Sequence, residues 1–172
     1  MAKTGRGRGR AHGAATPAVT ALETAGVPYT LHTFEVDLDA GGERFGVQVA
    51  RAMGVPPERM FKTLMVAAPD GGLAACVVPV SGQLDLRASA AVLGVKRLAL
   101  ADLALVERRT GYVRGGISPL GQRRRHRVVV DASALAGGRM YVSAGQRGLD
   151  LELDPEELVR LTQAVVADVV AA

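Results

Sequence analysis

Residues 61–80, FKTLMVAAPDGGLAACVVPV, contain two apolar runs separated by the turn sequence PDGG. Apolar runs of this length bounded by Pro, Asp and Gly are typical of strands joined by a tight turn. We therefore expect a β-hairpin with strands at 61–68 and 73–80. The second run contains AACVVPV, which is typical of a buried strand.

Upstream of the hairpin, the sequence predicts a helix, a strand and a second helix. Thr16 followed by Pro17 is a typical helix start, and Gly26 marks the helix end. Residues 29–36, YTLHTFEV, alternate in the way that a half-buried strand does. After a Gly-rich loop, a second helix is expected over residues 45–53.

Downstream of the hairpin, short helices and strands follow one another without a regular rhythm. We expect helices over 84–93, 102–111 and from Asp154 to about residue 170, and strands over 95–100, 127–130, 140–143 and 149–153. Hairpins mixed with helical connections favour a mixed sheet with helices packed around it over a doubly wound parallel sheet. We therefore expect a mixed α/β fold that forms a single domain over residues 16–172.

The charge of the chain is concentrated at its N-terminus. The 172 residues have a formal net charge of +4, and residues 1–13 contain four of the 21 basic residues and no acidic one. The remaining 17 basic residues balance the 17 acidic residues. Residues 1–15 are expected to form a disordered basic tail. That tail is either a solvated extension or a weak electrostatic arm for nucleic acid.

Few side chains are suited to metal, disulfide or cofactor chemistry. Cys76 is the only cysteine, it lies in an apolar run, and the chain has three histidines. This excludes an internal disulfide and a cysteine-based zinc site, and we expect neither a metal nor a cofactor. HExxH, Walker and GxGxxG motifs are absent. The sequence has neither 18 consecutive apolar residues nor an apolar signal-peptide core, so we expect a cytoplasmic protein.

Three places are unusual for a purely structural domain. Lys62 begins an apolar strand, either as a charge that protects a sheet edge or as a pocket lysine that binds an anion or polarises a carbonyl. Residues 111–121, GYVRGGISPLG, form either a plain connector or a loop whose N–H groups bind an oxyanion or phosphate. In residues 141–150, YVSAGQRGLD, Ser143 ends one strand and Asp150 opens the next. The nucleophile motif GxSxG is absent, which argues against a hydrolase serine at Ser143.

The chain resembles the YbaK/EbsC family of aminoacyl-tRNA deacylases over nearly everything from Thr16 onward. The matching stretches are TPAVTALETAGVPYTLHTF (16–34), FKTLMV (61–66), VSGQLDLR (80–87), RRTGYVRGGISPLGQRRR (108–125) and YVSAGQRGLDLEL (141–153). These motifs are most similar to the branch that clears cysteine from mischarged tRNA(Pro), rather than to the alanine-clearing branch.

This resemblance implies a mixed α/β domain with a highly curved central sheet surrounded by helices. It implies that Lys62 is the catalytic side chain. It also implies a substrate pocket formed by Phe34, Phe45, Thr63, Gly115, Gly116, Ile117, Ser143 and Asp150. Relatives often read HTY where this chain reads HTF, so Phe34 keeps the ring and lacks the hydroxyl. Any hydrogen bond from that hydroxyl to substrate is lost here.

The function implied by the resemblance is cleavage of the ester of mischarged Cys-tRNA(Pro), or of Cys-tRNA(Cys), in trans. The thiol of the substrate is the nucleophile, while Lys62 and the N–H groups of residues 115–117 position the ester. The partners implied are aminoacylated tRNA, bound at its 3′ end, and prolyl-tRNA synthetase, with no membrane. Residues 123–127, RRRHR, either contact phosphates or form a solvated charged loop.

Three other functions remain open on the sequence alone. The first is deacylation of Ala-tRNA(Pro) by attack of water. The second is a non-catalytic module that docks tRNA or a synthetase. The third is a regulatory binder of small amino-acid derivatives, which would bind its ligand without any dependence on tRNA.

Overall fold

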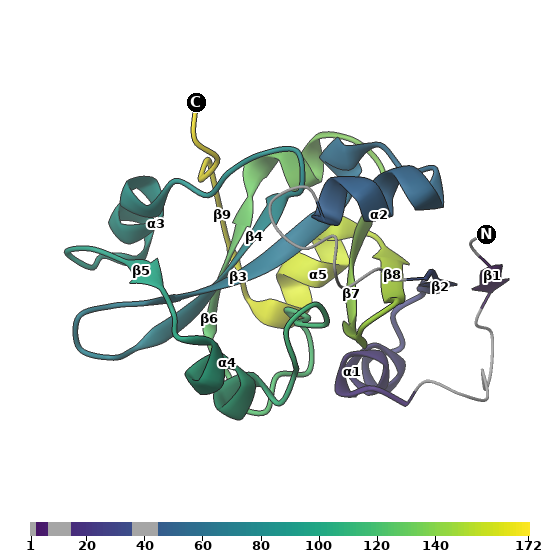
Figure 1. Cartoon of the computed structure of the whole chain (residues 1–172), viewed down its shortest axis with the longest axis horizontal. Coiled ribbons are helices and arrows are strands. Elements are labelled where there is room, and N and C mark those ends of the chain that lie inside the picture. Colours follow the sequence, from purple (N-terminus) through teal and green to yellow (C-terminus); the bar gives the residue numbers. More distant parts are fainter. Residues whose placement is uncertain (1–2, 7–14, 36–44) are drawn as a thin grey trace.

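Two β-sheets lie next to one another in the computed structural model, which describes residues 3–6, 15–35 and 45–172 (Figure 1). The five-stranded sheet has the order β5 (Ala99–Leu100), β3 (Phe61–Ala67), β4 (Leu73–Pro79), β6 (Arg127–Asp131) and β9 (Val165–Ala167). Strands β3 and β4 are antiparallel along their whole length, which confirms the predicted hairpin. Strand β6 runs parallel to both of its neighbours, so this sheet is mixed.

The four-stranded sheet is antiparallel throughout. Its order is β1 (Lys3–Arg6), β2 (Thr30–Thr33), β8 (Leu149–Leu153) and β7 (Met140–Gln146). The leucines at 149, 151 and 153 are buried and pack into the largest apolar cluster. Because side chains alternate along a strand, Asp150 and Glu152 lie on the opposite face of this sheet.

Among the residues that the structure describes, a single backbone bridge connects the two sheets. Met60, immediately before β3, pairs in parallel with Tyr141 of β7. Beyond this bridge β3 continues to pair with β5, whereas β7 continues to pair with β8, so the two strands part. The mixed α/β class is confirmed, and the expected curved sheet takes the form of two sheets that are joined here.

Helices cover the sheets, as predicted. They are α1 (Pro17–Ala25), α2 (Phe45–Met53), α3 (Leu86–Leu93), α4 (Leu103–Thr110) and α5 (Pro155–Thr162), with 3-10 turns η2 (Pro57–Arg59) and η3 (Ala132–Ala136). Side chains of Thr16, Asp85, Asp102 and Asp154 accept the hydrogen bonds that cap α1, α3, α4 and α5. None of the helices in the described ranges is long and apolar enough to cross a membrane.

Three apolar clusters form the core. The largest lies between the leucine face of the four-stranded sheet, α1, α5 and one face of β3, β4 and β6. A second lies on the other face of the five-stranded sheet, under α3. The third joins α2 to Met60, Val80 and Tyr141, at the bridge between the sheets.

The C-terminal segment differs from the prediction. The last helix was expected to reach about residue 170, but α5 ends at Thr162. Gln163 has a left-handed backbone with φ 52°, and its N–H donates to the Arg160 carbonyl. The β-branched pair Val165 and Val166 then pairs with β6 as β9. An open strand edge and β-branched residues therefore outweigh continued helix formation.

Two further segments differ from the sequence-based expectation. The strand expected over 95–100 is reduced to Ala99–Leu100. Residues 3–6, expected within a disordered tail over 1–15, form β1 against the free edge of β2, where unpaired backbone groups favour an added strand. Residues 1–2 and 7–14 of that tail, and residue 36 of the predicted strand, lie outside the described residues.

Candidate active site

A row of polar side chains crosses from one sheet to the other just beyond the bridge. Lys62 lies two residues after Met60, and Ser143 lies two residues after Tyr141, so both share the face that the bridge defines. Ser143 is paired with Asp150, and Asp150 is paired with His32 of β2. The strand register therefore places Lys62, Ser143, Asp150 and His32 on one face, in that order. We refer to these four residues as the polar row.

Asp150 is the most unusual member of the polar row. The residue is only 7% exposed, and no side chain in the described part of the chain forms a hydrogen bond or ion pair with its carboxyl group. Burial raises the pKa of this carboxyl to about 7. A buried carboxyl that titrates near neutral pH is typical of a functional site, because a structural carboxylate normally has a partner.

His32 is fixed by a hydrogen-bonded network behind the row. Its Nε2 lies 3.0 Å from Oε2 of Glu152, and the hydroxyl of Tyr141 donates to Oε1 of Glu152 at 3.0 Å. The rings of His32 and Tyr141 lie 5.4 Å apart. Burial opposes ionisation of Glu152, but hydrogen bonds from His32 and Tyr141 outweigh it and lower the pKa of this carboxyl. The ionised Glu152 therefore locks the orientation of both rings.

The two predicted pocket phenylalanines lie beside this network. Phe34 and Phe45 are half-buried and pack against the cluster of α2, Met60 and Tyr141. The backbone N–H of Phe34 donates to the Gly148 carbonyl at 2.9 Å, which ties the end of β2 to the β7–β8 turn. The two rings therefore form an apolar wall at the Met60–Tyr141 end of the polar row.

The loop 112–122 is held rigidly. The hydroxyl of the buried Tyr112 donates to the Leu120 carbonyl at 2.6 Å, across the loop. At its outer end, Nε of Arg147 donates to the Arg114 carbonyl at 2.7 Å. These bonds attach the loop to the turn between β7 and β8, next to the strands that hold Ser143 and Asp150.

Two glycines allow this close contact. Gly115 has a left-handed φ of 85°, which favours glycine. A Cβ atom on Gly116 would lie 2.9 Å from the backbone carbon of Gln146 and 3.0 Å from the nitrogen of Arg147. No side chain fits at Gly116 unless one of the two loops moves.

The polar backbone groups of this loop are not all available to a ligand. The N–H of Gly116 already donates to the Val113 carbonyl at 2.9 Å. An oxyanion site in the loop therefore relies on the N–H groups of Gly115 and Ile117, for which no backbone acceptor occurs in the described ranges. The side chain of Ile117 packs against the main apolar cluster and anchors the loop.

Thr63 does not join the polar row. It follows Lys62 on β3, so its side chain lies on the opposite face, between Phe61 and Met65 of the main cluster. Its Oγ1 atom is buried and has no hydrogen-bond partner in the part of the chain that the structure describes. Burying a hydroxyl without a hydrogen-bond partner costs free energy of folding, so the Thr63 hydroxyl is suited to bind a polar atom of a ligand.

Comparisons with known proteins identify the domain. Residues 46–161 match the family model of the aminoacyl-tRNA editing domain. The chain belongs to this family. It is 32% identical over 154 residues to the "Putative Cys-tRNA(Pro)/Cys-tRNA(Cys) deacylase EbsC" of Enterococcus faecalis, covering 90% of this chain and 92% of that protein. The resemblance to the YbaK/EbsC family is confirmed, and the chain is an aminoacyl-tRNA editing deacylase.

Solved structures confirm the fold of the editing domain. The "hypothetical protein APE2540" superposes with a TM-score of 0.79 at 29% identity, covering 91% of this chain and 100% of that one. A "putative trans-editing enzyme for prolyl tRNA synthetase" superposes with a TM-score of 0.76 at 23% identity, covering 93% and 100%. The overall fold, in which two sheets are linked, is therefore one that other proteins share.

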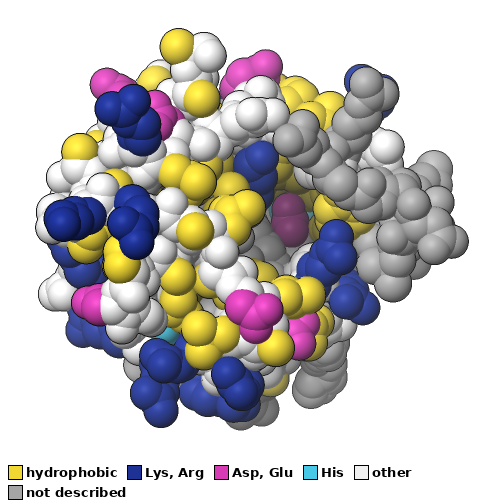
Figure 2. Space-filling view, turned by 60° about the vertical axis from the view of Figure 1, so that its left-hand side comes forward, with side chains coloured by type: hydrophobic (Ala, Val, Ile, Leu, Met, Phe, Trp, Pro, Cys, Tyr) yellow, Lys and Arg dark blue, Asp and Glu magenta, His cyan; other side chains and the backbone are white. Residues whose placement is uncertain are grey.

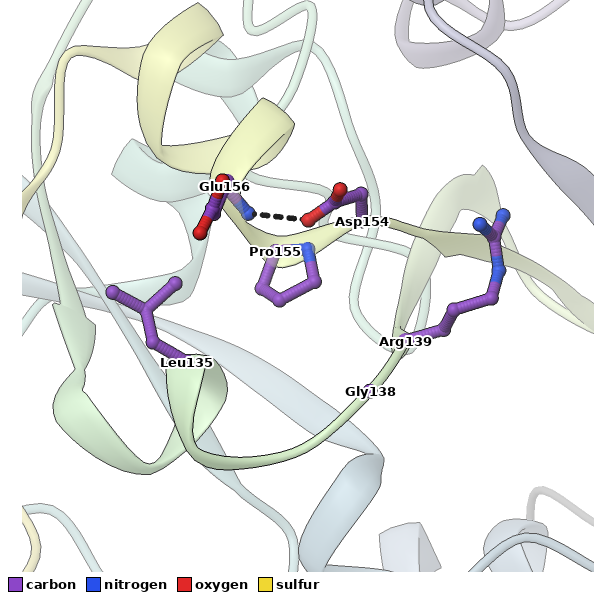
Figure 3. Close-up of a pocket in the computed structure, with 6 residues that line it drawn as sticks. All are labelled: Leu135, Gly138, Arg139, Asp154, Pro155 and Glu156. Atoms are coloured by element: carbon purple, nitrogen blue, oxygen red, sulfur yellow. Dashed lines mark hydrogen bonds between the residues drawn. The ribbon is translucent and has the colours of Figure 1, made fainter.

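The surface of the editing domain is hollowed on the face drawn in Figure 2, with an acidic side chain at depth and basic side chains at the rim. Another pocket, of about 300 Å³, lies elsewhere, between the end of η3 and the start of α5 (Figure 3). Its lining residues are Leu135, Gly138, Arg139, Asp154, Pro155 and Glu156. Asp154 is already used there to cap α5, accepting from the Glu156 N–H at 2.9 Å. This second pocket contains none of the predicted site residues.

The sequence alone did not indicate His32, Tyr141 and Glu152 as residues of this candidate site. The alternation of LDLEL signals that Asp150 and Glu152 share a face, and YTLHTF places His32 and Phe34 together on another strand. The strand pairings were needed to bring these faces together. Within the described ranges no group of His, Cys, Asp and Glu side chains is arranged to hold a metal ion.

Proposed function

We propose that this editing domain deacylates Cys-tRNA(Pro) or Cys-tRNA(Cys) in trans, with the thiol of the substrate as the nucleophile. The observation that carries the proposal is the polar row, which sets a lysine and a buried carboxyl on one face with Ser143 between them. The hydroxyl of Ser143 accepts from the Gly145 N–H at 3.2 Å, and His32 is engaged by Glu152. The row therefore offers positioning and charge, but no serine that is paired with a base.

A cysteinyl ester brings its own nucleophile. The reference pKa of a thiol is near 8.5, so roughly a few per cent is thiolate at neutral pH. In the proposed step, sulfur forms a bond to the ester carbonyl carbon, the bond from that carbon to the tRNA oxygen breaks, and the thiol proton ends on the tRNA hydroxyl. Water then opens the resulting cyclic thioester to free cysteine. The net reaction is a hydrolysis, although its first step is an internal displacement.

Each element of the site has a role in this scheme. The Lys62 ammonium stabilises negative charge at the ester carbonyl or holds the phosphate of the terminal adenosine. The N–H groups of Gly115 and Ile117 stabilise the oxyanion. Asp150, when ionised, accepts a hydrogen bond from the α-ammonium group of the substrate, which supplies the partner that the carboxyl lacks. Phe34 and Phe45 exclude water from one side of the small substrate side chain.

The choice of cysteine over alanine rests on the sequence motifs and on the relative from Enterococcus faecalis, whose name specifies cysteinyl substrates. An apolar pocket alone discriminates between small side chains only modestly. A substrate-supplied nucleophile discriminates far more strongly, because alanine has none. We further propose that prolyl-tRNA synthetase, the source of such errors on tRNA(Pro), is the partner that presents the substrate.

The proposal is tested by assaying deacylation of Cys-tRNA(Pro) and Ala-tRNA(Pro) with wild-type protein, Lys62→Ala and the exposed control Lys96→Ala. We expect wild type and Lys96→Ala to cleave the cysteinyl ester and to leave the alanyl ester nearly intact. Lys62→Ala should lose activity by at least ~100-fold while its circular dichroism and melting temperature stay close to those of wild type.

Two results would overturn the proposal. Full activity of a folded Lys62→Ala variant would remove the lysine from the mechanism. Faster cleavage of the alanyl ester would assign the domain to attack by water.

A further inference from the structure

Five arginines converge where the loop 112–122 leaves and rejoins the body of the molecule. The loop is closed by two backbone bonds, from the N–H of Arg123 to the Thr110 carbonyl at 2.8 Å and from the N–H of Arg124 to the Arg109 carbonyl at 3.1 Å. These bonds place the last turn of α4 beside the segment that follows the loop. The side chains brought together are Arg108, Arg109, Arg123, Arg124 and Arg125, which we call the arginine neck.

The charge of the arginine neck is not neutralised locally. Four of its side chains are exposed and Arg109 is half-buried. In the described part of the chain none of the five forms an ion pair, and Arg125 instead binds the amide oxygen of Gln163. The pKa of the nearby His126 is lowered by burial and, to a smaller extent, by repulsion from the positive charges of Arg109 and Arg124.

Basic side chains continue from the neck to the candidate site. Arg114 and Arg147 are exposed and lie at the outer end of the same loop, where Nε of Arg147 binds the Arg114 carbonyl. The aliphatic part of Arg147 packs over Gly115, the first residue of the proposed oxyanion loop. Figure 2 likewise shows Lys and Arg side chains along the lower edge of this face and again at the rim of the hollow.

We propose that the arginine neck binds phosphates of the acceptor helix of the tRNA while the 3′ end reaches the polar row. Double-helical RNA is bound mostly through its shape, phosphates and 2′-hydroxyls, and the forked guanidinium group matches a phosphate. The proposal rests on the proposed function and adds the surface that holds the tRNA body. It also explains how a body with balanced charge would bind a polyanion, because seven arginines of the described residues are gathered around the loop 112–122.

An acidic protein surface is the other class of partner that would fit exposed arginines. The tRNA is favoured because the basic path leads to the site where the ester must lie. A docked protein would not require this continuity.

The test compares Arg123→Gln/Arg124→Gln with the matched control Lys96→Gln/Arg97→Gln, which removes the same charge from exposed residues after α3. Binding of uncharged tRNA(Pro) is measured by fluorescence anisotropy between 50 and 200 mM salt, and the KM for Cys-tRNA(Pro) is measured in parallel. We expect the neck variant to bind about tenfold more weakly, with the slope of log affinity against log salt reduced by about 2. The KM should rise by a similar factor, and the control should match wild type.

The outcomes separate this inference from the proposed function. Binding of uncharged tRNA needs no catalysis, so a loss of affinity in the neck variant supports the surface even if Cys-tRNA(Pro) is not cleaved. Unchanged affinity and salt slope in the neck variant would overturn the inference while leaving the deacylase assignment intact. The same weakening in both variants would also overturn it, since net charge alone would then explain the effect.

Discussion

Asp150 is the residue of the candidate site whose environment is most unusual, because its carboxyl is buried. Its pKa of about 7 exceeds the usual value of 3.8, so the folded protein binds more protons than the unfolded chain between about pH 4 and pH 7. The free energy of unfolding should therefore fall as the pH rises through this window and should stay lower above it. The loss contributed by Asp150 is at most about 4 kcal/mol, at ~1.4 kcal/mol for each pKa unit.

Asp150→Asn should remove this contribution. Urea unfolding at pH 5 and pH 8 is expected to show the variant gaining stability over wild type as the pH rises, because the amide cannot ionise. The exposed Asp168→Asn variant is the control and should follow wild type. An Asp150→Asn variant whose stability parallels that of wild type at both pH values would show that this carboxyl stays ionised. Deacylation should also fall in Asp150→Asn, since the amide oxygen carries no negative charge and binds the ammonium of the substrate more weakly than a carboxylate does.

Gly116 is the second residue for which local geometry makes a firm prediction. Gly116→Ala forces a Cβ against the backbone of Gln146 and Arg147, at a cost of about 1–3 kcal/mol. The displaced loop should lose most of the deacylase activity. Gly137→Ala is the matched control, because its Cβ meets no atom within 4 Å and its backbone is extended. Thermal melts and initial deacylation rates are measured for the two variants. Equal melting temperatures and equal rates would refute the close contact at Gly116.

The sequence indicates several candidate site residues but not how they come together. Lys62 is noticeable because a charge interrupts an apolar strand, and the glycines of the loop because they permit unusual torsions. The polar row depends on pairing between β3, β7, β8 and β2, and the β3–β7 register rests on one bridge, Met60 to Tyr141. Residues that meet through long-range pairing leave no local signal, which is why His32 and Glu152 were missed.

At the scale of elements, local signals predicted the helices that carry their own caps. Caps at Thr16, Asp102 and Asp154 and the left-handed glycines at 26, 94 and 111 are readable in the sequence. The end of α5 was predicted wrongly because Gln163, rather than Gly, takes the left-handed position there. What ends this helix is the free edge of β6, which accepts β9, and this edge exists only in the folded sheet.

Thr16 links one of these elements to the site-bearing sheet. Its Oγ1 accepts from the Val19 N–H at 3.2 Å to cap α1, and donates to the Ala144 carbonyl of β7 at 2.6 Å. Thr16→Ala should therefore cost about 2–3 kcal/mol, more than an ordinary cap. Asp102→Ala, which removes the exposed cap of α4, should cost about 1 kcal/mol. Chemical denaturation of the two variants measures both losses in the free energy of unfolding. A Thr16→Ala cost no larger than that of Asp102→Ala would show that the bond to β7 adds nothing.

At the scale of the whole molecule, the candidate site lies where the two sheets are joined by the bridge between Met60 and Tyr141. Met60, just before β3, pairs with Tyr141 of β7, and the two strands then pair with different neighbours, which places Lys62 and Ser143 just beyond the bridge. The order of predicted elements indicates the mixed α/β class, and composition indicates the balanced charge of the body. Neither predicts that arginines from α4 and residues 123–125 meet at one loop. That arrangement follows from backbone bonds that close the loop.

In the proposed reaction the substrate supplies the nucleophile and the protein supplies geometry and charge. Single-turnover deacylation of cysteinyl-tRNA(Pro) and seryl-tRNA(Pro) by the wild-type protein tests it most directly. The two side chains are close in shape, but a hydroxyl is a far weaker nucleophile than a thiol at neutral pH. We expect the seryl ester to be cleaved at least ~100-fold more slowly. Equal rates on the two esters would contradict it and would require an activated water.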